Sequence, residues 1–463
     1  MPDKQSKQRI DDILTRAVGE FIDPDGAFRR KLENNPEKIV IKFGIDPTRP
    51  DIHIGHAVVL RKLRQFQDLG CKVVFLVGDY TGQIGDPTGK NKIRPEIQLA
   101  EIQANMKTYL AQVGKILQED SKVFSWIKNS DWFTDVSDVI PGPDSSTNIE
   151  IMEGNTKKVY PLDPNSFPGK AILLENSRMQ KIDLKNRQIY SVSFSYVLRT
   201  LRNITHSRLI ARDMFKERIN KGEELYMNEM LYPVLQGLDS HILHKVYGAC
   251  DLEIGGTDQT FNMLMGRDVM KMYKQPEQAV MAVKIIEGTD GKEKMSKSLD
   301  NYIGITDEPS DMYGKVMSIP DTSIMNYFEL CTFTPLSEVA DIRKKLTENS
   351  ANPKDIKMSL ARQIVSIYHG EAKAKEAEEN FEKTFAKGGV PDDVLEIQVK
   401  VDTKLVDVLL HEKIVTSKTE FRRLVTEGAI TDMDTNEKIK DIDALALGTV
   451  YKIGKHRFLK LKF

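Results

Sequence analysis

The feature that most constrains the fold of this 463-residue chain is a strand–helix–strand pattern near its N-terminus. Residues 39–43 (IVIKF) form a β-type run that leads into the turn-rich segment GIDPTRPD. The segment that follows, which Gly70 can end, places four apolar residues at helical spacing: Leu60, Leu63, Phe66 and Leu69. The apolar run KVVFLVG comes next. The three segments therefore predict a parallel βαβ unit in an α/β fold.

A second unit of the same kind recurs later in the chain. The run DLEI is followed by a Gly-Gly turn, a helical pattern and the run AVMAVKII. Two such units are typical of the halves of a Rossmann-like, doubly wound parallel sheet. Pro-, Gly-, Asp- and Asn-rich sequence at about 135–188 predicts an insertion between them. Domain boundaries are expected at 1–320 for the sheet domain, 321–387 for a helical domain, 388–403 for a linker and 404–463 for a small α+β unit.

The C-terminal unit has two local signatures. Ser417 and Glu420 in SKTE form the pattern of a capping box that opens an amphipathic helix. The last residues, TVYKIGKHRFLKLKF, alternate apolar and basic residues around a Gly-Lys turn, which predicts a hairpin.

Composition limits the classes of function. The 67 basic and 68 acidic residues give a net charge of −1, so any RNA contact must use a local basic surface. Cys71, Cys250 and Cys331 are far apart and fit neither a disulfide framework nor a zinc site, which indicates a reducing compartment. The N-terminus has no apolar signal region and no run approaches membrane-spanning length, so we expect a cytoplasmic protein. No metal ligand set is expected.

Two short motifs carry the chemistry. HIGH, at His53–His56, opens the first helix, and KMSKS, at Lys294–Ser298, lies in a Gly/Lys-rich loop after a late strand. A helix start offers free N–H groups and a positive dipole end to phosphates, and Gly55 permits close approach. Imidazole, hydroxyl and ammonium groups could stabilise the charge that builds on a departing pyrophosphate. The alternative is two buried histidines and a solvated lysine loop, but two motifs in this order and placement favour nucleotide chemistry.

With these motifs, the chain resembles the class I aminoacyl-tRNA synthetases and, in detail, bacterial tyrosyl-tRNA synthetases. KFGIDPTRPDIHIGH, VGDYTGQIGDPTGK, MLYPVLQGLD, EIGGTDQ and KMSKS stand in that family's order. The resemblance implies a ligase that activates L-tyrosine with ATP to tyrosyl-adenylate and transfers tyrosine to the 3′ end of tRNA(Tyr). It also implies a homodimer and Mg²⁺ carried with ATP.

The resemblance assigns residues to three roles. Expected catalytic residues are Thr48, His53, His56, Lys90, Arg94, Lys294 and Lys297. Expected ATP-binding residues are Gly44, Asp46, Gly55, Gly256, Asp258, Met295 and Ser296. Expected tyrosine-binding residues are Asp86, Tyr232, Gln236, Asp239 and Gln259, and the resemblance implies that Asp239 reads the phenol hydroxyl.

The spacing of three of these residues also makes sense without the family. Tyr232, Gln236 and Asp239 would share one face of a helix, with Pro233 tolerated only near the helix start. The alternative interpretation of this spacing is a surface helix with scattered polar residues. One departure from the family is Lys42, which stands where a tyrosine often shares the substrate phenol. Whether Lys42 reaches that hydroxyl stays open from sequence.

The C-terminal unit resembles the S-four-type RNA-binding domain of the family. Its expected RNA-binding residues are Lys418, Arg422, Arg423, Lys455 and Arg457. Basic side chains on a helix and a hairpin can neutralise phosphates with little base readout. The alternative is a solvated basic face. Rivals for the whole chain are a tryptophanyl synthetase, a small-molecule nucleotidyltransferase and a non-enzymatic RNA-binding paralogue.

Overall fold

The computed structural model describes most of the chain, in segments. These are residues 4–48, 51–86, 97, 99–133, 148–153, 156–161, 192, 194–210, 212–383, 394–400, 403–412, 414–415, 417–435, 437–454 and 457–463. The chain divides into two compact units, Met1–Ile285 and Ile286–Phe463, and each is described by itself.

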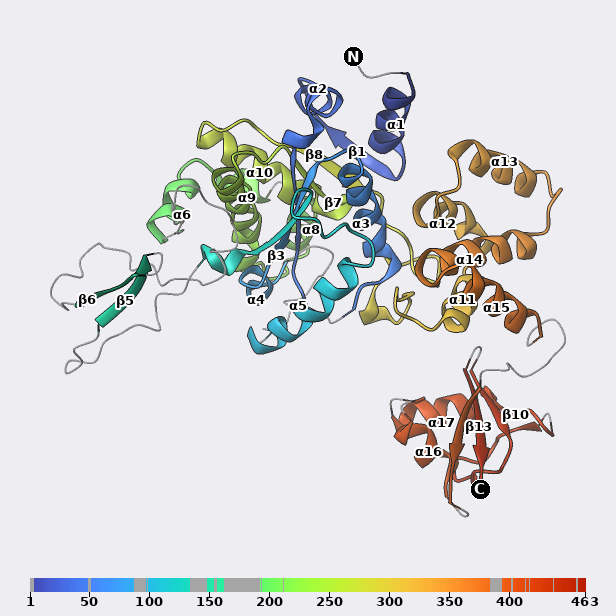
Figure 1. Ribbon diagram of the computed structural model, residues 1–463. Helices are drawn as coiled ribbons and strands as arrows, with labels where there is room; N and C mark the ends of the chain where they lie inside the picture. The colour runs from blue at the N-terminus through green and yellow to red at the C-terminus, as the bar shows by residue number, and fades with distance from the viewer. Residues whose placement is uncertain are drawn as a thin grey trace. The chain divides into compact units, whose positions relative to one another are not determined.

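The first unit is built on a six-stranded sheet (Figure 1). Its strands are β1 (Val18–Ile22), β2 (Val40–Ile45), β3 (Lys72–Val77), β4 (Phe124–Lys128), β7 (Leu252–Gly256) and β8 (Ala279–Val283). The order is β1-β8-β7-β2-β3-β4, with β1 antiparallel to β8 and all other pairs parallel. The chain winds outward from β2 through β3 to β4, then returns to β7 and β8. The predicted doubly wound sheet is confirmed, and its switch point lies between β2 and β7.

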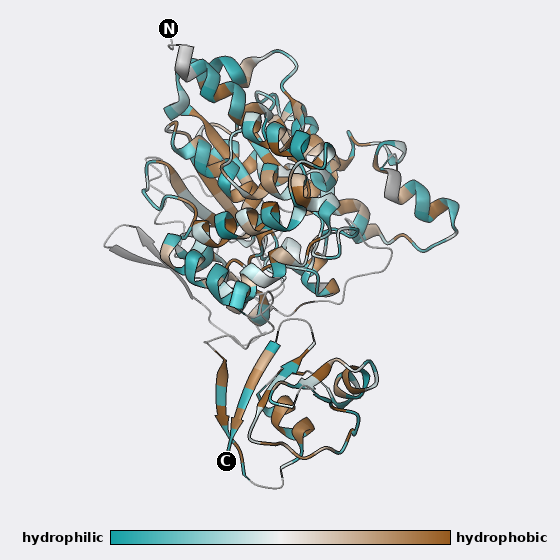
Figure 2. Cartoon of the chain, turned by 90° about the vertical axis from the view of Figure 1, so that its right-hand side faces the viewer, coloured by the Kyte–Doolittle hydropathy of each residue, from teal (hydrophilic) through white to brown (hydrophobic). Residues whose placement is uncertain are grey.

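Helices cover this sheet, and their sequence signals act as expected. They are α1 (Lys4–Thr15), α2 (Ala27–Asn34), α3 (Ile54–Gln67), α4 (Thr81–Ile84), α5 (Leu99–Val113), α6 (Phe194–Leu201), α7 (His206–Ile210), α8 (Asp213–Asn220), α9 (Met227–Tyr247) and α10 (Thr260–Met272). Leu60, Leu63 and Phe66 of α3 are buried, and Gly70 takes a left-handed φ of 98° after the helix. Figure 2 shows brown, apolar strands enclosed by helices that carry teal residues on their outer faces.

Helix α9 corrects one expectation. It begins at Met227, so Pro233 lies in its second turn rather than near its start. A proline there removes one helical hydrogen bond. The buried side of α9, with Val234 and Leu238, packs in one apolar cluster with Met265 and Val269 of α10, and this packing offsets the loss.

Little of the predicted insertion at 135–188 is described. The part that is described forms an antiparallel hairpin of β5 (Asn148–Glu153) and β6 (Thr156–Pro161). The other residues of that range lie outside the described residues.

The second unit contains a helical part and a C-terminal part. The helices α11 (Pro309–Met317), α12 (Ile324–Cys331), α13 (Leu336–Thr347), α14 (Pro353–His369) and α15 (Glu371–Phe381) begin somewhat before residue 320. The C-terminal part has α16 (Leu405–His411), α17 (Lys418–Thr426) and a sheet ordered β11-β10-β12-β13-β9. Its strands are β9 (Leu395–Gln398), β10 (Ile430–Asp432), β11 (Glu437–Lys438), β12 (Val450–Ile453) and β13 (Arg457–Lys462).

In the C-terminal part, the Ser417 half of the predicted capping box and the predicted hairpin are confirmed. Ser417 Oγ accepts the backbone N–H of Glu420 at 3.1 Å and caps α17. Strands β12 and β13 form the predicted antiparallel hairpin.

Candidate active site

The site residues of the first unit gather at the carboxyl ends of β2 and β7. Gly44 lies in the last part of β2, and Asp46 follows that strand directly. Gly256 ends β7, and Asp258 lies in the short helical turn Thr257–Gln259 after it. In open α/β sheets this switch point is where ligands bind.

The first motif occupies the N-terminus of α3. His53 is the N-cap residue in extended backbone conformation, and its backbone N–H donates to His56 Nδ1 at 3.4 Å. The two imidazole rings lie 3.9 Å apart between centroids. Gly55 is in the first turn, and the Thr48 N–H donates to the Asp46 carbonyl at 2.8 Å in the preceding turn. The predicted placement of HIGH on a helix start is confirmed, and the positive end of the dipole of α3 lies at this motif.

Asp46 joins the end of β2 to two helices. Its Oδ1 accepts the Thr81 hydroxyl of α4 at 2.8 Å, and its Oδ2 accepts the Tyr232 hydroxyl of α9 at 2.8 Å. Burial is the largest cause that raises the pKa of Tyr232 well above its ordinary value, and the nearby carboxylates Asp46 and Asp86 raise it further. Asp46, an expected ATP-binding residue, and Tyr232, an expected tyrosine-binding residue, are therefore joined by a hydrogen bond.

The Asp239 carboxyl is almost fully buried. The Trp132 indole N–H donates to its Oδ1 at 2.9 Å, and the Asn129 amide lies 3.5 Å from its Oδ2. Burial raises the pKa of Asp239 to about 7, against the opposing effects of Lys42 and these donors. Asp239 and Tyr232 are both buried, so the predicted polar face of α9 points inward rather than to solvent.

A third cluster brings together Asp86 and Gln259, as the resemblance implied. The Gln259 amide donates to Asp86 Oδ2 at 2.6 Å and accepts from Asn262 at 2.9 Å. The buried Arg212 guanidinium lies over the rings of Phe215 and Phe261, at 5.3 and 5.6 Å. Burial lowers the pKa of Arg212, while Asp86, Asp258 and Tyr232 oppose that shift.

The Lys42 ammonium bonds to three other groups of the protein. Its ammonium pairs with Glu253 Oε1 at 2.8 Å and donates to Ser240 Oγ and the Gln236 carbonyl, both at 2.8 Å. An ammonium has three N–H donors, so these three acceptors use all of them. The Gln236 side chain in turn donates to Glu253 Oε1 at 2.9 Å.

The second motif belongs to the second unit. Lys294 is exposed and forms an isolated β-bridge with Glu287, and Met295 turns its side chain inward. The Ser296 N–H donates to Asn301 Oδ1 at 2.8 Å. The Lys297 ammonium lies 5.9 Å from the centroid of the Tyr302 ring. Lys90 and Arg94 lie outside the described residues.

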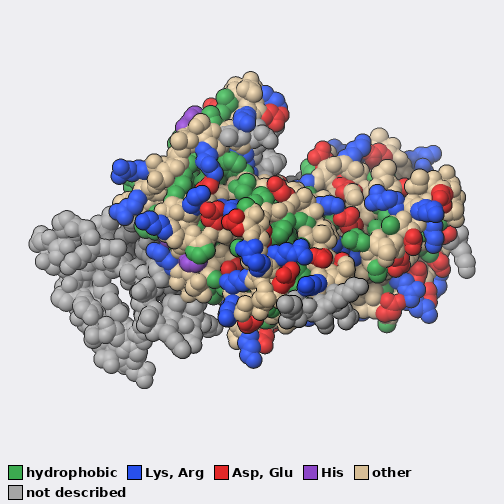
Figure 3. All heavy atoms as spheres, turned by 90° about the horizontal axis from the view of Figure 1, so that it is seen from above, with side chains coloured by type: hydrophobic (Ala, Val, Ile, Leu, Met, Phe, Trp, Pro, Cys, Tyr) green, Lys and Arg blue, Asp and Glu red, His purple; other side chains and the backbone are tan. Residues whose placement is uncertain are grey.

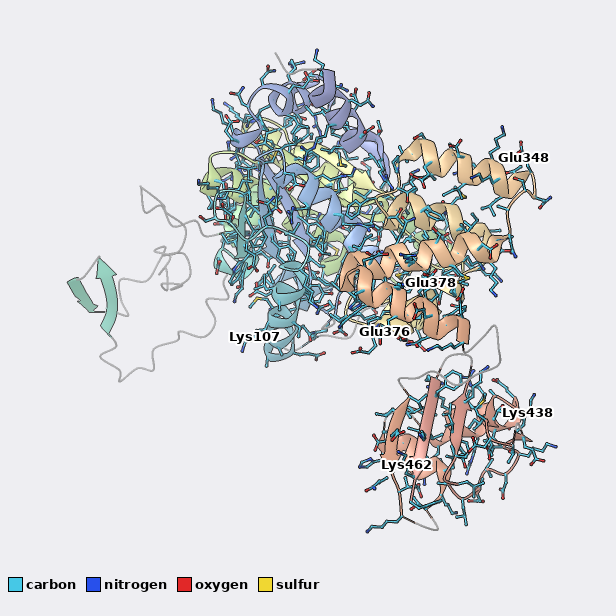
Figure 4. All side chains as sticks on the ribbon, turned by 45° about the vertical axis from the view of Figure 1, so that its right-hand side comes forward. Lys107, Glu348, Glu376, Glu378, Lys438 and Lys462 are labelled. Carbon is cyan, nitrogen blue, oxygen red and sulfur yellow. The ribbon has the colours of Figure 1, made fainter. Side chains whose placement is uncertain are left out.

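The expected RNA-binding cations are exposed but partly paired. Lys418, Arg422 and Arg423 line α17, and Arg423 lies 3.9 Å from Glu427. Arg457 donates to the Ile414 carbonyl and lies 3.6 Å from Glu420. Lys455 lies outside the described residues. Figure 4 shows the labelled Lys438 and Lys462 projecting from this part of the chain.

Sequence reasoning missed several residues of the site. Thr81, Asn129, Trp132, Arg212 and Glu253 all contact or flank predicted residues. The only signal for Asn129 and Trp132 was a polar turn, NSDW, at the carboxyl end of a strand. Within the described segments, no group of three His, Cys, Asp or Glu residues could hold a metal ion. No described helix is long and apolar enough to cross a membrane.

Together, the doubly wound sheet, the helix start at its switch point and the buried polar residues beside it are typical of a nucleotide-dependent α/β protein. The family described as class I tRNA synthetases (W and Y) matches residues 34–140 and 173–386, and the chain belongs to this family. The resemblance inferred from the motifs is thereby confirmed.

Relatives over nearly the full length carry one name. A tyrosine–tRNA ligase of Moorella thermoacetica is 37% identical over 460 residues, covering 97% of this chain and 94% of the relative. A tyrosine–tRNA ligase of Thermotoga maritima is also 37% identical, covering 99% and 98%.

Solved structures support the fold. A C-terminally truncated Aspergillus nidulans mitochondrial tyrosyl-tRNA synthetase matches with a TM-score of 0.54 at 19% identity, covering 82% of this chain and 99% of its own. An Archaeoglobus fulgidus tyrosyl-tRNA synthetase complexed with L-tyrosine matches with a TM-score of 0.51 at 16% identity, covering 81% and 99%. The predicted fold class is confirmed.

Proposed function

We propose that this chain is a tyrosine–tRNA ligase, which activates tyrosine with ATP and transfers it to tRNA(Tyr). The observation that carries the proposal is Asp239, a buried carboxyl beside the switch point of a class I synthetase sheet. Class I synthetases use ATP as a substrate, and the near-full-length relatives bear the name tyrosine–tRNA ligase.

Recognition of the amino acid depends on how the pocket directs its polar atoms. The Trp132 indole N–H already donates to Oδ1 of Asp239, while Oδ2 has only a long contact with Asn129. Oδ2 is therefore the oxygen that accepts a hydrogen bond from the substrate phenol. At the other end, Asp86, Tyr232 and Gln259 supply a carboxylate, a hydroxyl and an amide for the substrate ammonium. Gln236 lies between these ends on the same helix.

Activation joins the substrate carboxylate to the α-phosphorus of ATP. The new bond is carboxylate oxygen to phosphorus, and the bond from the α-phosphorus to its bridging oxygen breaks, so pyrophosphate leaves with the negative charge. His53, His56 and Thr48 are placed to hold phosphates at the start of α3, with Gly44 and Gly55 allowing close approach. Gly256 and Asp258, in the turn after β7, hold the ribose, and the Asp258 carboxylate accepts hydrogen bonds from the ribose hydroxyls.

Four basic side chains supply the remaining positive charge. Lys294, Lys297, Lys90 and Arg94 stabilise the departing pyrophosphate, and the backbones of Met295 and Ser296 bind the nucleotide. Mg²⁺ arrives with ATP and offsets phosphate charge.

The tRNA step gives the C-terminal parts their roles. We assign 321–387 to an anticodon-region helical domain and 404–463 to an S-four-type RNA-binding domain. Strand β9, which lies within the expected linker 388–403, pairs with β13 and belongs with the second of these domains. A chain ending at Val390 should retain tyrosine-dependent pyrophosphate exchange and lose efficient tRNA charging. Normal charging by that folded, shortened chain would contradict the assignment.

A homodimer is part of the same proposal. Large apolar side chains of α6 and α9 are exposed in the single chain, at 76% for Phe194, 47% for Leu198 and 67% for Met227. Phe194 and Leu198, four residues apart on α6, share one face of that helix and are suited to contact a second copy of the chain. Sedimentation should show a dimer that Phe194→Glu with Leu198→Glu dissociates. We place the enzyme in the cytoplasm, a reducing compartment in which its three free, buried cysteines persist as thiols.

One experiment tests the activity itself. ATP–pyrophosphate exchange is measured with each of the twenty amino acids, and tyrosine should be the one that drives it. Exchange driven by tryptophan would establish the tryptophanyl rival instead. If no amino acid drives exchange, the chain is a nucleotidyltransferase of another kind or a non-enzymatic paralogue.

A further inference from the structure

A buried ion pair lies beneath the tyrosine pocket, and the reaction scheme above does not use it. Lys42 of β2 and Glu253 of β7 are fully enclosed, and their charged atoms are 2.8 Å apart. The two residues are direct partners in the parallel pairing of β2 with β7. The pair therefore bridges the two strands at the switch point of the sheet.

Every acceptor and donor of the pair is matched. Glu253 Oε1 also accepts from the Gln236 amide, and Oε2 accepts from Ser240 Oγ at 3.2 Å and from the Gln278 amide. Helix α10 leaves room for this network by having Gly266 there, where a Cβ would stand 2.9 Å from Glu253 Oε2. A buried ion pair costs desolvation that apolar side chains of the same size avoid, so packing alone does not explain it.

The network holds the turn of α9 that carries Asp239. Gln236 and Ser240, which bond to Lys42 and Glu253, lie three residues before and one residue after Asp239. The three residues are on one buried helix, so fixing two of them fixes the direction of the third. Lys42 itself has no donor left for a substrate hydroxyl.

The two charges also act on Asp239 with opposite sign. Burial is the main cause that raises the pKa of Asp239; Lys42 lowers that pKa and Glu253 raises it. The other groups that face this pocket are the donors Trp132 and Asn129 and, around Tyr232, the carboxylates Asp46 and Asp86. Behind Asn129, Asp79 and Lys128 form an ion pair of their own at 3.2 Å.

We propose that the Lys42–Glu253 pair is a positioning device for tyrosine specificity, which fixes the turn of α9 bearing Asp239 and sets the charge of that carboxyl without touching the substrate. This inference rests on the proposed tyrosine–tRNA ligase activity and deepens it. It assigns to Lys42 an indirect role in place of the phenol contact usual at that position.

The test uses full-length Lys42→Met and Glu253→Gln chains. The ratio of kcat/KM for tyrosine to that for phenylalanine is measured in pyrophosphate exchange from pH 5.5 to 9. The pH at which this ratio rises should move up in Lys42→Met, because an ammonium is lost, and down in Glu253→Gln, because a carboxylate is lost. On the acid side of the midpoint, an upward move of one pH unit lowers the ratio about tenfold, and a downward move of one unit raises it about tenfold. The KM for ATP should stay unchanged in both variants.

Lys62→Met is the matched control. Lys62 is another buried lysine of the first unit, and its ammonium donates to the Ile13 carbonyl at 2.7 Å. Burial lowers the pKa of Lys62 to about 7, so its charge is present mainly below that pH. Losing that ammonium should leave the midpoint where it is in the unaltered chain. A shift equal to that of Lys42→Met would mean that any buried lysine produces the effect, and would overturn the proposal.

The outcomes separate this inference from the proposed function. Absence of tyrosine-driven exchange in the unaltered chain would reject the function itself. If that exchange is present, equal losses for tyrosine and phenylalanine without opposite pH shifts would reduce the pair to packing and overturn the inference. Glu253→Gln keeps the size of the side chain, so if Lys42→Met does not fold, the Glu253→Gln midpoint alone decides: a downward shift supports the proposal and an unchanged one rejects it.

Discussion

The proposed tyrosine pocket around Asp239 and the C-terminal basic surface use similar ion pairs in opposite surroundings. In the pocket, Lys42 and Glu253 are both almost completely buried. On the C-terminal surface, Lys460 lies 2.6 Å from Glu396, and both side chains are more than 40% exposed. Lys460 and Lys462 lower the pKa of Glu396 to about 2, yet water and salt screen such a pair.

The difference indicates what each region can do. A buried charge cannot exchange partners without a large desolvation cost, so the pocket can keep one arrangement and distinguish one hydroxyl group. A surface cation exchanges a carboxylate for a phosphate easily, so the C-terminal unit can bind a backbone without reading bases. Figure 3 shows basic and acidic side chains interspersed over the face in view, in keeping with the net charge of −1.

The largest expected effect tests the buried side of this comparison. Asp239→Ala should reduce the tyrosine-to-phenylalanine ratio of kcat/KM by several orders of magnitude. This enzyme family is itself the standard example of such discrimination, about 10⁵-fold without editing, and the magnitude is taken from the family. The loss should fall mainly on tyrosine, and Lys42→Met should cost far less. Competition kinetics with both amino acids measures it; an intact ratio in Asp239→Ala would show that another group reads the phenol.

A smaller loss should follow from removing Lys297, a half-buried lysine to which we assign a catalytic role. Lys297→Ala should slow adenylate formation by about 10²–10³-fold, because its ammonium acts on charge present mainly in the transition state. Tyrosine affinity should change little, as rapid-quench kinetics and equilibrium binding can show.

Lys315 is the matched control for Lys297. Its ammonium lies 5.6 Å from the same Tyr302 ring but pairs with Asp307 at 2.7 Å. Lys315→Ala should leave the rate of adenylate formation nearly unchanged. Weaker tyrosine binding at an unchanged rate in Lys297→Ala would assign Lys297 a different role.

On the C-terminal surface, effects should be modest and salt-dependent. Lys418→Ala with Arg422→Ala should weaken tRNA binding about tenfold and lower the salt slope by roughly one to two. Neither residue pairs with a carboxylate in the described part of the chain, whereas Arg423 lies 3.9 Å from Glu427. Arg423→Ala should therefore weaken binding less. Filter binding at several salt concentrations measures both, and an equal loss would show that surface pairing is irrelevant to RNA binding.

The smallest expected effect concerns stability. The pKa of Asp239 is raised from 3.8 to about 7 in the folded chain, so the folded state holds its proton more tightly than the unfolded state. The stability this proton contributes is lost as pH rises towards 7. Asp239→Asn should therefore raise the melting temperature above that of the unaltered chain by more at pH 8 than at pH 5. The two increases should differ by about 2–4 °C or more. Calorimetry without substrates checks it, and a pH-independent difference would mean that Asp239 is ionised at both pH values.

Local patterns in the sequence determined the elements and the placement of the motifs. Apolar spacing and Gly70 defined α3, so HIGH had to lie at a helix start. The spacing of Tyr232, Gln236 and Asp239 predicted one face of α9, because helical period depends on neighbouring residues alone. The same spacing could not say where α9 begins, and Pro233 proved to lie a turn deeper than expected.

The tertiary structure decided which partners those side chains have. Lys42 could have faced the substrate, but the pairing of β2 with β7 sets Glu253 beside it, and α9 supplies Ser240 and the Gln236 carbonyl. Trp132 follows strand β4, and it reaches Asp239 only because α9 packs in the same apolar cluster as β4. The order of strands in a sheet depends on burial over the whole domain. The partner of a buried polar side chain therefore cannot be read from a local sequence pattern, and neither can the pKa that this partner helps to set.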